Sequence, residues 1–130
     1  MICGLHHVQI AIPPGGEEAA RRFYGHLLGC AEIPKPEPLK GRGGVWYRLP
    51  DGRQLHLGIE DPFRPSRKAH PAFEAKDLEG LAERLTQHGY PVHWDEGVPD
   101  VRRFYTWDPF GNRLEFMDRT SASRVDGLER

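Results

Sequence analysis

The sequence predicts an α+β fold made of two copies of one strand–helix–three-strand (βαβββ) unit. Residues 50–57 align without a gap on residues 109–116, and each half opens with a strand that leads into an amphipathic helix. Gly and Pro mark the turns between these segments. A unit this short cannot bury both faces of its sheet alone. We therefore expect two curved sheets, each with one packed helix, that together form a cleft.

The first unit is predicted over about residues 4–60. Its elements, in order, are a strand over residues 5–12, a helix over 17–28, and strands over 30–33, 45–49 and 54–59. The first strand alternates around β-branched residues and meets the turn Pro13-Pro14-Gly15-Gly16. Gly29 ends the helix, and residues 34–44 form a Pro/Gly-rich loop. Pro50-Asp51-Gly52 is typical of a hairpin turn.

The same pattern begins again after a polar linker over residues 61–68, so the second unit is predicted over about 69–118. Its elements, in order, are a strand over residues 70–75, a helix from 78 to 88, and strands over 91–94, 103–107 and 113–117. Asp77 is a good N-cap for the helix, and Gly89 closes it. Residues 119–130 are polar and are expected to form a flexible tail after one domain that ends near residue 118.

Composition narrows the possible partners. The chain has 18 basic and 19 acidic side chains in 130 residues, so its near-zero net charge predicts neither nucleic acid nor a membrane surface as a partner. The apolar runs are too short to span a bilayer, and the N-terminus lacks the pattern of a secretory signal. Cys3 and Cys30 are too few for a disulfide framework. These features favour a cytoplasmic protein that acts on a small molecule.

The repeat selects four polar residues at equivalent places: His7 matches His70, and His56 matches Glu115. Strand side chains alternate faces, and the apolar neighbours of these residues suit the helix-packed face. Three imidazoles and one carboxylate then point into the cleft. That set suits a divalent ion such as Zn²⁺, Ni²⁺, Fe²⁺, Co²⁺ or Mn²⁺. Imidazole must be neutral to ligate, so binding should weaken below about pH 6.

Alternation sends further large side chains toward the same cleft. They are Trp46, Arg48, Arg103, Tyr105 and Trp107. Guanidinium groups beside aromatic walls indicate a small anionic or aromatic acid as the ligand, because Arg pairs with a carboxylate in a bidentate way. The sequence therefore predicts these five residues as substrate-binding.

The chain resembles the vicinal-oxygen-chelate superfamily of glyoxalases, bleomycin- and fosfomycin-resistance proteins and extradiol dioxygenases over about residues 4–118. The segments that carry the resemblance are residues 5–10 (LHHVQI), 22–29 (RFYGHLLG), 54–57 (QLHL), 70–73 (HPAF) and 108–116 (DPFGNRLEF). The resemblance implies the glyoxalase-like fold and places the family's ligand positions on His7, His56, His70 and Glu115. It also implies that a metal holds two neighbouring oxygens of the substrate, with Glu115 and His56 as candidates for a catalytic role as base.

The resemblance leaves the reaction open. Gln9 and the segment 97–103 depart from the fosfomycin-resistance pattern, and His56 stands where glyoxalase I would carry Glu. His7, His70 and Glu115 could supply the two-His, one-Glu set of a dioxygenase. We expect a metal-dependent enzyme of the glyoxalase-type lyase or isomerase class or of the dioxygenase class; the alternative is a metal-free binding protein that resembles bleomycin-resistance proteins. A homodimer is also expected, in which His7 and His56 of one subunit could meet His70 and Glu115 of the other.

Overall fold

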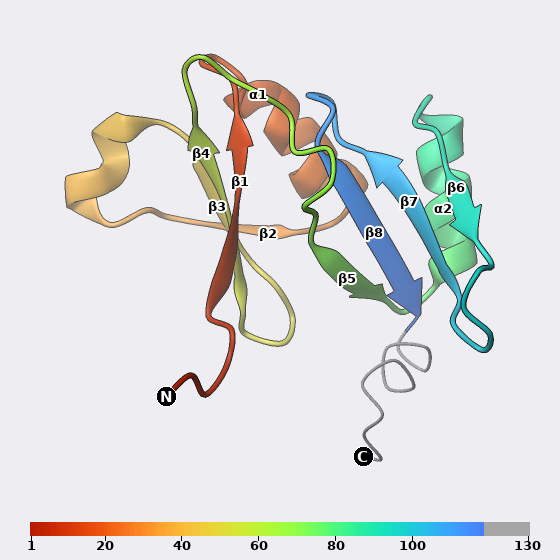
Figure 1. Cartoon of the computed structure of the whole chain (residues 1–130). Helices are drawn as coiled ribbons and strands as arrows, with labels where there is room; N and C mark the ends of the chain where they lie inside the picture. Colours follow the sequence, from red (N-terminus) through yellow and green to blue (C-terminus); the bar gives the residue numbers. More distant parts are fainter. Residues whose placement is uncertain (119–130) are drawn as a thin grey trace. The chain divides into compact units, whose positions relative to one another are not determined.

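The computed structural model describes residues 1–118 and divides the chain into two compact units (Figure 1). The first unit spans Met1–Ser66, and the second begins at Arg67. Each unit has one four-stranded mixed sheet and one main helix, as the α+β prediction required. The predicted tail over residues 119–130 lies outside the described residues.

The first unit forms its sheet in the strand order β1-β4-β3-β2. The elements are β1 (His7–Ile12), α1 (Glu17–Ala20), the π-helix η1 (Arg21–Leu27), β2 (Ala31–Ile33), the 3₁₀ helix η2 (Glu37–Arg42), β3 (Val45–Arg48) and β4 (Gln54–Ile59). Strand β1 runs parallel to β4, and the other neighbours are antiparallel. The crossover from β1 through the helix therefore places the first strand beside the last one of its own unit.

The second unit repeats this topology in the order β5-β8-β7-β6. The elements are β5 (Ala72–Ala75), α2 (Leu78–Gln87), β6 (His93–Asp95), β7 (Arg103–Trp107) and β8 (Arg113–Asp118). Strand β5 runs parallel to β8, and the remaining pairs are antiparallel. Helix α2 begins where the Asp77 carboxylate accepts a hydrogen bond from the Gly80 amide at 3.0 Å, as predicted for its N-cap.

The register of the strands confirms the gap-free alignment of the two units. Trp46 lies opposite His56 in the β3–β4 pair, and Tyr105 lies opposite Glu115 in the β7–β8 pair. The duplication thus preserves which side chains are cross-strand neighbours, and not only the order of the elements.

Each sheet buries one face against its helix. In the first unit Leu55 and Leu57 on β4 are 1% exposed, and in the second Leu114 on β8 is fully buried. Burial of one such side chain contributes about 1.5–3 kcal/mol. Residues in between, among them His56 and Glu115, therefore project from the opposite face of their sheets.

Several local features differ from the sequence prediction, among them the strands β1 and β6, which begin at His7 and His93 and not at residues 5 and 91. The first helix has only one α-helical turn before it continues as a π-helix, which ends with the Leu28 amide bonded to the Phe23 carbonyl at 2.9 Å. The loop over residues 34–44 contains the 3₁₀ helix η2. Strand β5 begins at Ala72 and not at His70, because the intervening Pro71 has no amide hydrogen to donate.

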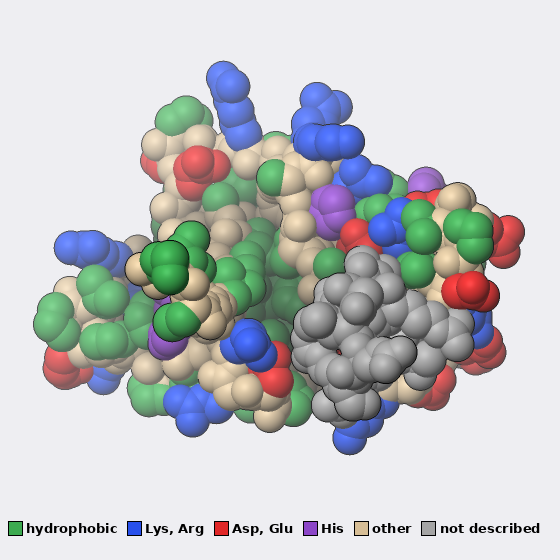
Figure 2. All heavy atoms as spheres, turned by 60° about the horizontal axis from the view of Figure 1, so that its bottom comes forward, with side chains coloured by type: hydrophobic (Ala, Val, Ile, Leu, Met, Phe, Trp, Pro, Cys, Tyr) green, Lys and Arg blue, Asp and Glu red, His purple; other side chains and the backbone are tan. Residues whose placement is uncertain are grey.

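Basic and acidic side chains are interspersed over the face drawn in Figure 2. Within residues 1–118 no helix is long and apolar enough to cross a membrane.

Candidate metal centre

In the first unit the open face of the sheet carries a stack of three rings. The His56 ring on β4 lies between the rings of its neighbours on β1 and β3. Its centroid is 4.2 Å from that of His7 and 3.7 Å from that of Trp46, and all three planes are nearly parallel. This stack follows from the register, because Trp46 is the direct cross-strand partner of His56.

The stack holds His56 in its neutral form. Only 3% of this residue is exposed. Burial, with smaller contributions from the neighbouring His7 and His6, lowers the pKa of His56 to about 4. Its Nε2 lies 2.8 Å from the Gln54 side-chain carbonyl oxygen, which only accepts, so Nε2 donates and the ring lone pair is on Nδ1. His56 is therefore a neutral nitrogen donor at pH 7.

The His7 ring contacts His6, which the strand pattern does not predict. Its Nδ1 lies 2.9 Å from the Nδ1 of His6, and the two rings meet edge to face. Strict alternation would turn His6 to the opposite face. It does not apply here, because β1 begins only at His7 and His6 precedes the strand, although the His6 carbonyl accepts a hydrogen bond from the Gln54 amide at 3.2 Å. The adjacent histidine pair was the only sequence signal for this contact.

In the second unit His70 and Glu115 are in direct contact. His70 Nε2 lies 2.8 Å from Glu115 Oε1, and His70 Nδ1 lies 2.8 Å from the backbone carbonyl of Lys68. A carbonyl only accepts, so Nδ1 donates to it, and the Nε2 of a neutral ring then turns its lone pair toward the carboxylate. Such an arrangement requires a proton or a cation between the two groups. Glu115 is only 5% exposed, so water does little to satisfy it.

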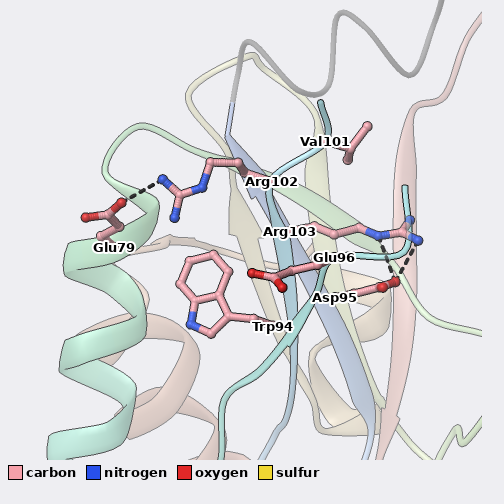
Figure 3. A pocket seen from close by; sticks show the side chains of 7 residues that line it. All are labelled: Glu79, Trp94, Asp95, Glu96, Val101, Arg102 and Arg103. Carbon is pink, nitrogen blue, oxygen red and sulfur yellow. Dashed lines mark hydrogen bonds and ion pairs between the residues drawn. The ribbon is translucent and has the colours of Figure 1, made fainter. Parts of the chain in front are cut away.

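A second carboxylate reaches this pair through an arginine. Arg103 on β7 donates to Asp95 Oδ2 from Nη2 at 2.8 Å and from Nε at 3.1 Å, and its Nη1 lies 3.4 Å from Glu115 Oε2. Figure 3 shows the Asp95–Arg103 pair from close by. Arg103 thus links an acidic residue on the edge strand β6 to the buried Glu115.

The hollow drawn in Figure 3 belongs to the second unit and lies beside this network. Its lining consists of Glu79, Trp94, Asp95, Glu96, Val101, Arg102 and Arg103. It includes Arg103 but neither His70 nor Glu115. The hollow therefore does not contain the candidate ligands, which are brought together by their direct contacts.

The remaining predicted substrate residues lie on the same open faces. Tyr105 is 5.4 Å from His70 between ring centroids, and burial followed by the charge of Glu115 raises its pKa. Trp107 meets His93 edge to face at 4.9 Å. Arg48 lies exposed at the end of β3. Tyr105 and Trp107 share one face of β7, as alternation predicts, and their role in substrate binding stays a prediction. The contact between Trp107 and His93 was not predicted.

Each unit thus brings together two of the four predicted ligands. Within residues 1–118 no group of three or more His, Cys, Asp or Glu side chains gathers so that it could hold a metal ion. The donor chemistry nevertheless fits a divalent ion. Two ligands about 2.1 Å from one ion and at a right angle to each other lie about 3 Å apart, close to the spacing of His70 and Glu115. Both side chains also make a further hydrogen bond, His70 to the Lys68 carbonyl and Glu115 to Arg103, and such bonds usually orient metal ligands.

A sequence model of the Glyoxalase/Bleomycin resistance protein/Dioxygenase superfamily matches residues 4–116. The crystal structure of a glyoxalase family protein from Bacillus anthracis is 48% identical, with a TM-score of 0.86, and the match covers 91% of this chain and 96% of that one. No protein of curated function matches the sequence significantly.

More distant structures share the fold alone. The fosfomycin resistance protein FosX from Listeria monocytogenes is 19% identical with a TM-score of 0.74, and the match covers 95% of this chain and 99% of that one. Lactoylglutathione lyase from Agrobacterium tumefaciens is 19% identical with a TM-score of 0.64, covering 87% and 92% respectively. The fold therefore occurs with different activities, and the reaction has to be argued from the site.

Proposed function

Because this chain belongs to the Glyoxalase/Bleomycin resistance protein/Dioxygenase superfamily, we propose that it is a metal-dependent enzyme acting on a small anionic substrate. His7, His56, His70 and Glu115 would hold a divalent ion. The observation that carries this proposal is the 2.8 Å contact between His70 Nε2 and Glu115 Oε1, because a divalent ion could take the place of the proton between these two metal-ligand atoms. When bound, the ion would polarise two neighbouring oxygens of the substrate.

The side chains around the ion would have separate roles in proton transfer and substrate binding. Glu115 is the candidate base, since a buried carboxylate held by Arg103 keeps one fixed orientation. His56 supplies a neutral imidazole, and its ring stack prevents rotation away from the site. Tyr105 and Trp107 would provide an aromatic wall beside Glu115. These features support proton transfer next to a chelated oxygen, as a glyoxalase-type lyase or isomerase or a dioxygenase would use.

Metal uptake tests this proposal directly. Wild-type protein freed of metal and then dialysed against Zn²⁺, Ni²⁺ or Mn²⁺ should retain about one ion per site at neutral pH, measured by elemental analysis. His70→Ala should reduce retention to less than about 0.2 ion per chain. His93→Ala is the matched control and should retain the metal, because His93 lies on the edge strand β6 and its ring meets that of Trp107, which is not a predicted ligand. Equal retention by both variants would show that His70 is not a ligand.

A complete site requires that both half-sites meet, and we propose that this happens in a homodimer. His56→Ala and Glu115→Ala chains, unfolded together and refolded, then form mixed dimers in which one of the two sites has no substitution. Metal should return to about one quarter of all sites in a random mixture. If each site is made within a single chain, mixing restores nothing. Light scattering on the same samples gives the oligomeric state.

One observation favours the alternative of a metal-free small-molecule binder. His56 Nε2 already has a hydrogen-bond partner in Gln54, and both faces of its ring are covered by His7 and Trp46, so that it forms part of an aromatic wall. If the binder reading is right, wild-type protein takes up no metal under the conditions above. Gln54→Ala separates the two: if His56 ligates through Nδ1, loss of the hydrogen bond that orients its ring should weaken metal binding by about tenfold or more, whereas a binder takes up no metal in either form.

A further inference from the structure

Three arginines of the second unit lie on or beside β7 and β8, and they differ in how their charges are neutralised. Arg102 pairs with Glu79 at 2.6 Å, and Arg103 pairs with Asp95 at 2.8 Å. Within residues 1–118 no carboxylate pairs with Arg113, although Asp95 is close enough to feel its charge. Arg113 is therefore the arginine whose charge is available to a ligand.

The position of Arg113 is fixed by an aromatic ring and not by hydrogen bonds. Its guanidinium carbon lies 4.1 Å from the centroid of Tyr105, which is a cation–π contact. Its Nε is buried and has no hydrogen-bond acceptor among the described residues. Leaving a buried N–H of a charged group without an acceptor is unfavourable, so this donor calls for an acceptor from outside the unit.

Arg113 also lies at a suitable distance from the candidate ligand Glu115. The two residues are separated by one position on β8, so both project from the same face, with Cα atoms about 7 Å apart. Arg113 faces Trp107 across the strand pair, and Glu115 faces Tyr105. A small molecule that reaches from Glu115 to Arg113 would lie against both rings.

We propose that Arg113 receives an oxyanion of the substrate, with Tyr105 holding the guanidinium in place. The proposal deepens the proposed function: the substrate carries a carboxylate or a phosphate-like group in addition to the two oxygens on the metal. Arg103 then has a separate task. Its guanidinium is held between Asp95 and Glu115 and orients the latter, so it contributes little to binding the oxyanion.

Anion binding by the full-length, chelator-treated protein tests this assignment. Inorganic phosphate and acetate are titrated separately, and the shifts of backbone amide signals are followed by NMR. In the wild type the shifts should concentrate on β7 and β8 near Arg113. Arg113→Met should weaken binding of the preferred anion by about tenfold or more, because charge-assisted bonds to the guanidinium are lost. A preference for acetate or for phosphate identifies which oxyanion the site accepts.

Arg102→Met is the matched control, because it removes the same charge nearby and should change binding less than about threefold. Arg113→Lys keeps the positive charge but lacks the forked donors of the guanidinium, so its affinity for the anion should fall between those of the wild type and Arg113→Met. This variant keeps the test decisive if Arg113→Met does not fold. Equal weakening by Arg102→Met and Arg113→Met would overturn the proposal, as would unchanged binding in Arg113→Met. The anion titration uses metal-free protein and is therefore independent of the metal-uptake experiment. A failure of metal uptake would overturn the proposed metal centre without changing the conclusion about Arg113.

Discussion

Each unit carries one pair of predicted ligands, His7 and His56 in the first and His70 and Glu115 in the second. The two pairs lie on strands of the same topology, but different interactions hold them. In the first unit His56 is enclosed by the rings of His7 and Trp46, and its environment keeps it neutral. In the second unit the equivalent Glu115 accepts a hydrogen bond from Arg103 and lies 2.8 Å from His70 Nε2. The duplicated register fixes where a side chain emerges from the sheet. Which interactions hold that side chain depends on its neighbours alone.

This difference suggests a division of tasks. A stacked neutral imidazole changes little when a charged ligand arrives, whereas a buried carboxylate shared by a histidine and an arginine responds strongly to an added cation. We therefore expect the second unit to dominate metal affinity and the first unit to add selectivity. Three predictions test how far the comparison between the units extends.

The largest effect should come from the equivalent core positions Leu55 and Leu114. Both side chains are buried on the helix-facing side of their sheets. Leu55→Ala and Leu114→Ala should each lower the free energy of unfolding by about 2–5 kcal/mol, measured by urea denaturation. Leu5→Ala, at a 61% exposed position, should change it by less than about 0.5 kcal/mol. A difference above about 2 kcal/mol between the two core variants would show that the units are not equally packed.

An intermediate effect should appear in the pH dependence of stability. The pKa of His56 is about 4 in the folded chain and about 6.5 in an unfolded one, so the unfolded state binds more protons between these values. Stability from neutral His56 is complete above about pH 6.5 and is lost as the pH falls toward 4. Between these limits the chelator-treated wild type should lose roughly 2–3 kcal/mol more unfolding free energy than His56→Phe. If the unfolding free energies of the two proteins changed in parallel with pH, His56 would not be held neutral by its ring stack.

The smallest effect concerns the helices. Helix α2 has the side-chain cap of Asp77, whereas α1 begins after Gly16 without one. Asp77→Ala should lower the unfolding free energy by about 1 kcal/mol. Gly80→Ala should have a similar effect, because its Cβ would collide with the capping carboxylate. Glu79→Gln removes an exposed ion pair in the same turn and should cost less than about 0.5 kcal/mol in thermal or urea denaturation.

Much of the fold could be predicted because its signals are local. The alternation in residues 54–59 and 113–117, the Asp-Gly turn at 51–52 and the Asp77 cap each act within a few residues. The starts of strands were harder to predict. Pro71 delays β5, and β1 begins only at His7, because a strand exists only where its partner offers hydrogen bonds. The π-helix of η1 had no visible signal in the sequence.

The candidate site divides in the same way. The repeat selected His7, His56, His70 and Glu115, and the structure brings them together as two pairs, while the four-residue centre stays a prediction. The contacts of Gln54, Asp95 and Arg113 with these or neighbouring side chains were not predicted. They depend on the rotamers of long side chains, which a sequence pattern does not specify.

By itself, the sequence determined two equivalent sheets and the faces from which their polar residues project, because periodicity and turn chemistry are encoded within each short segment. Only the tertiary structure decided that His56 is enclosed by rings, that Arg103 is occupied by two carboxylates and that Arg113 is left with a tyrosine. Those outcomes depend on burial and on charges from strands that are distant in the chain, and such terms exist only after the sheets have formed.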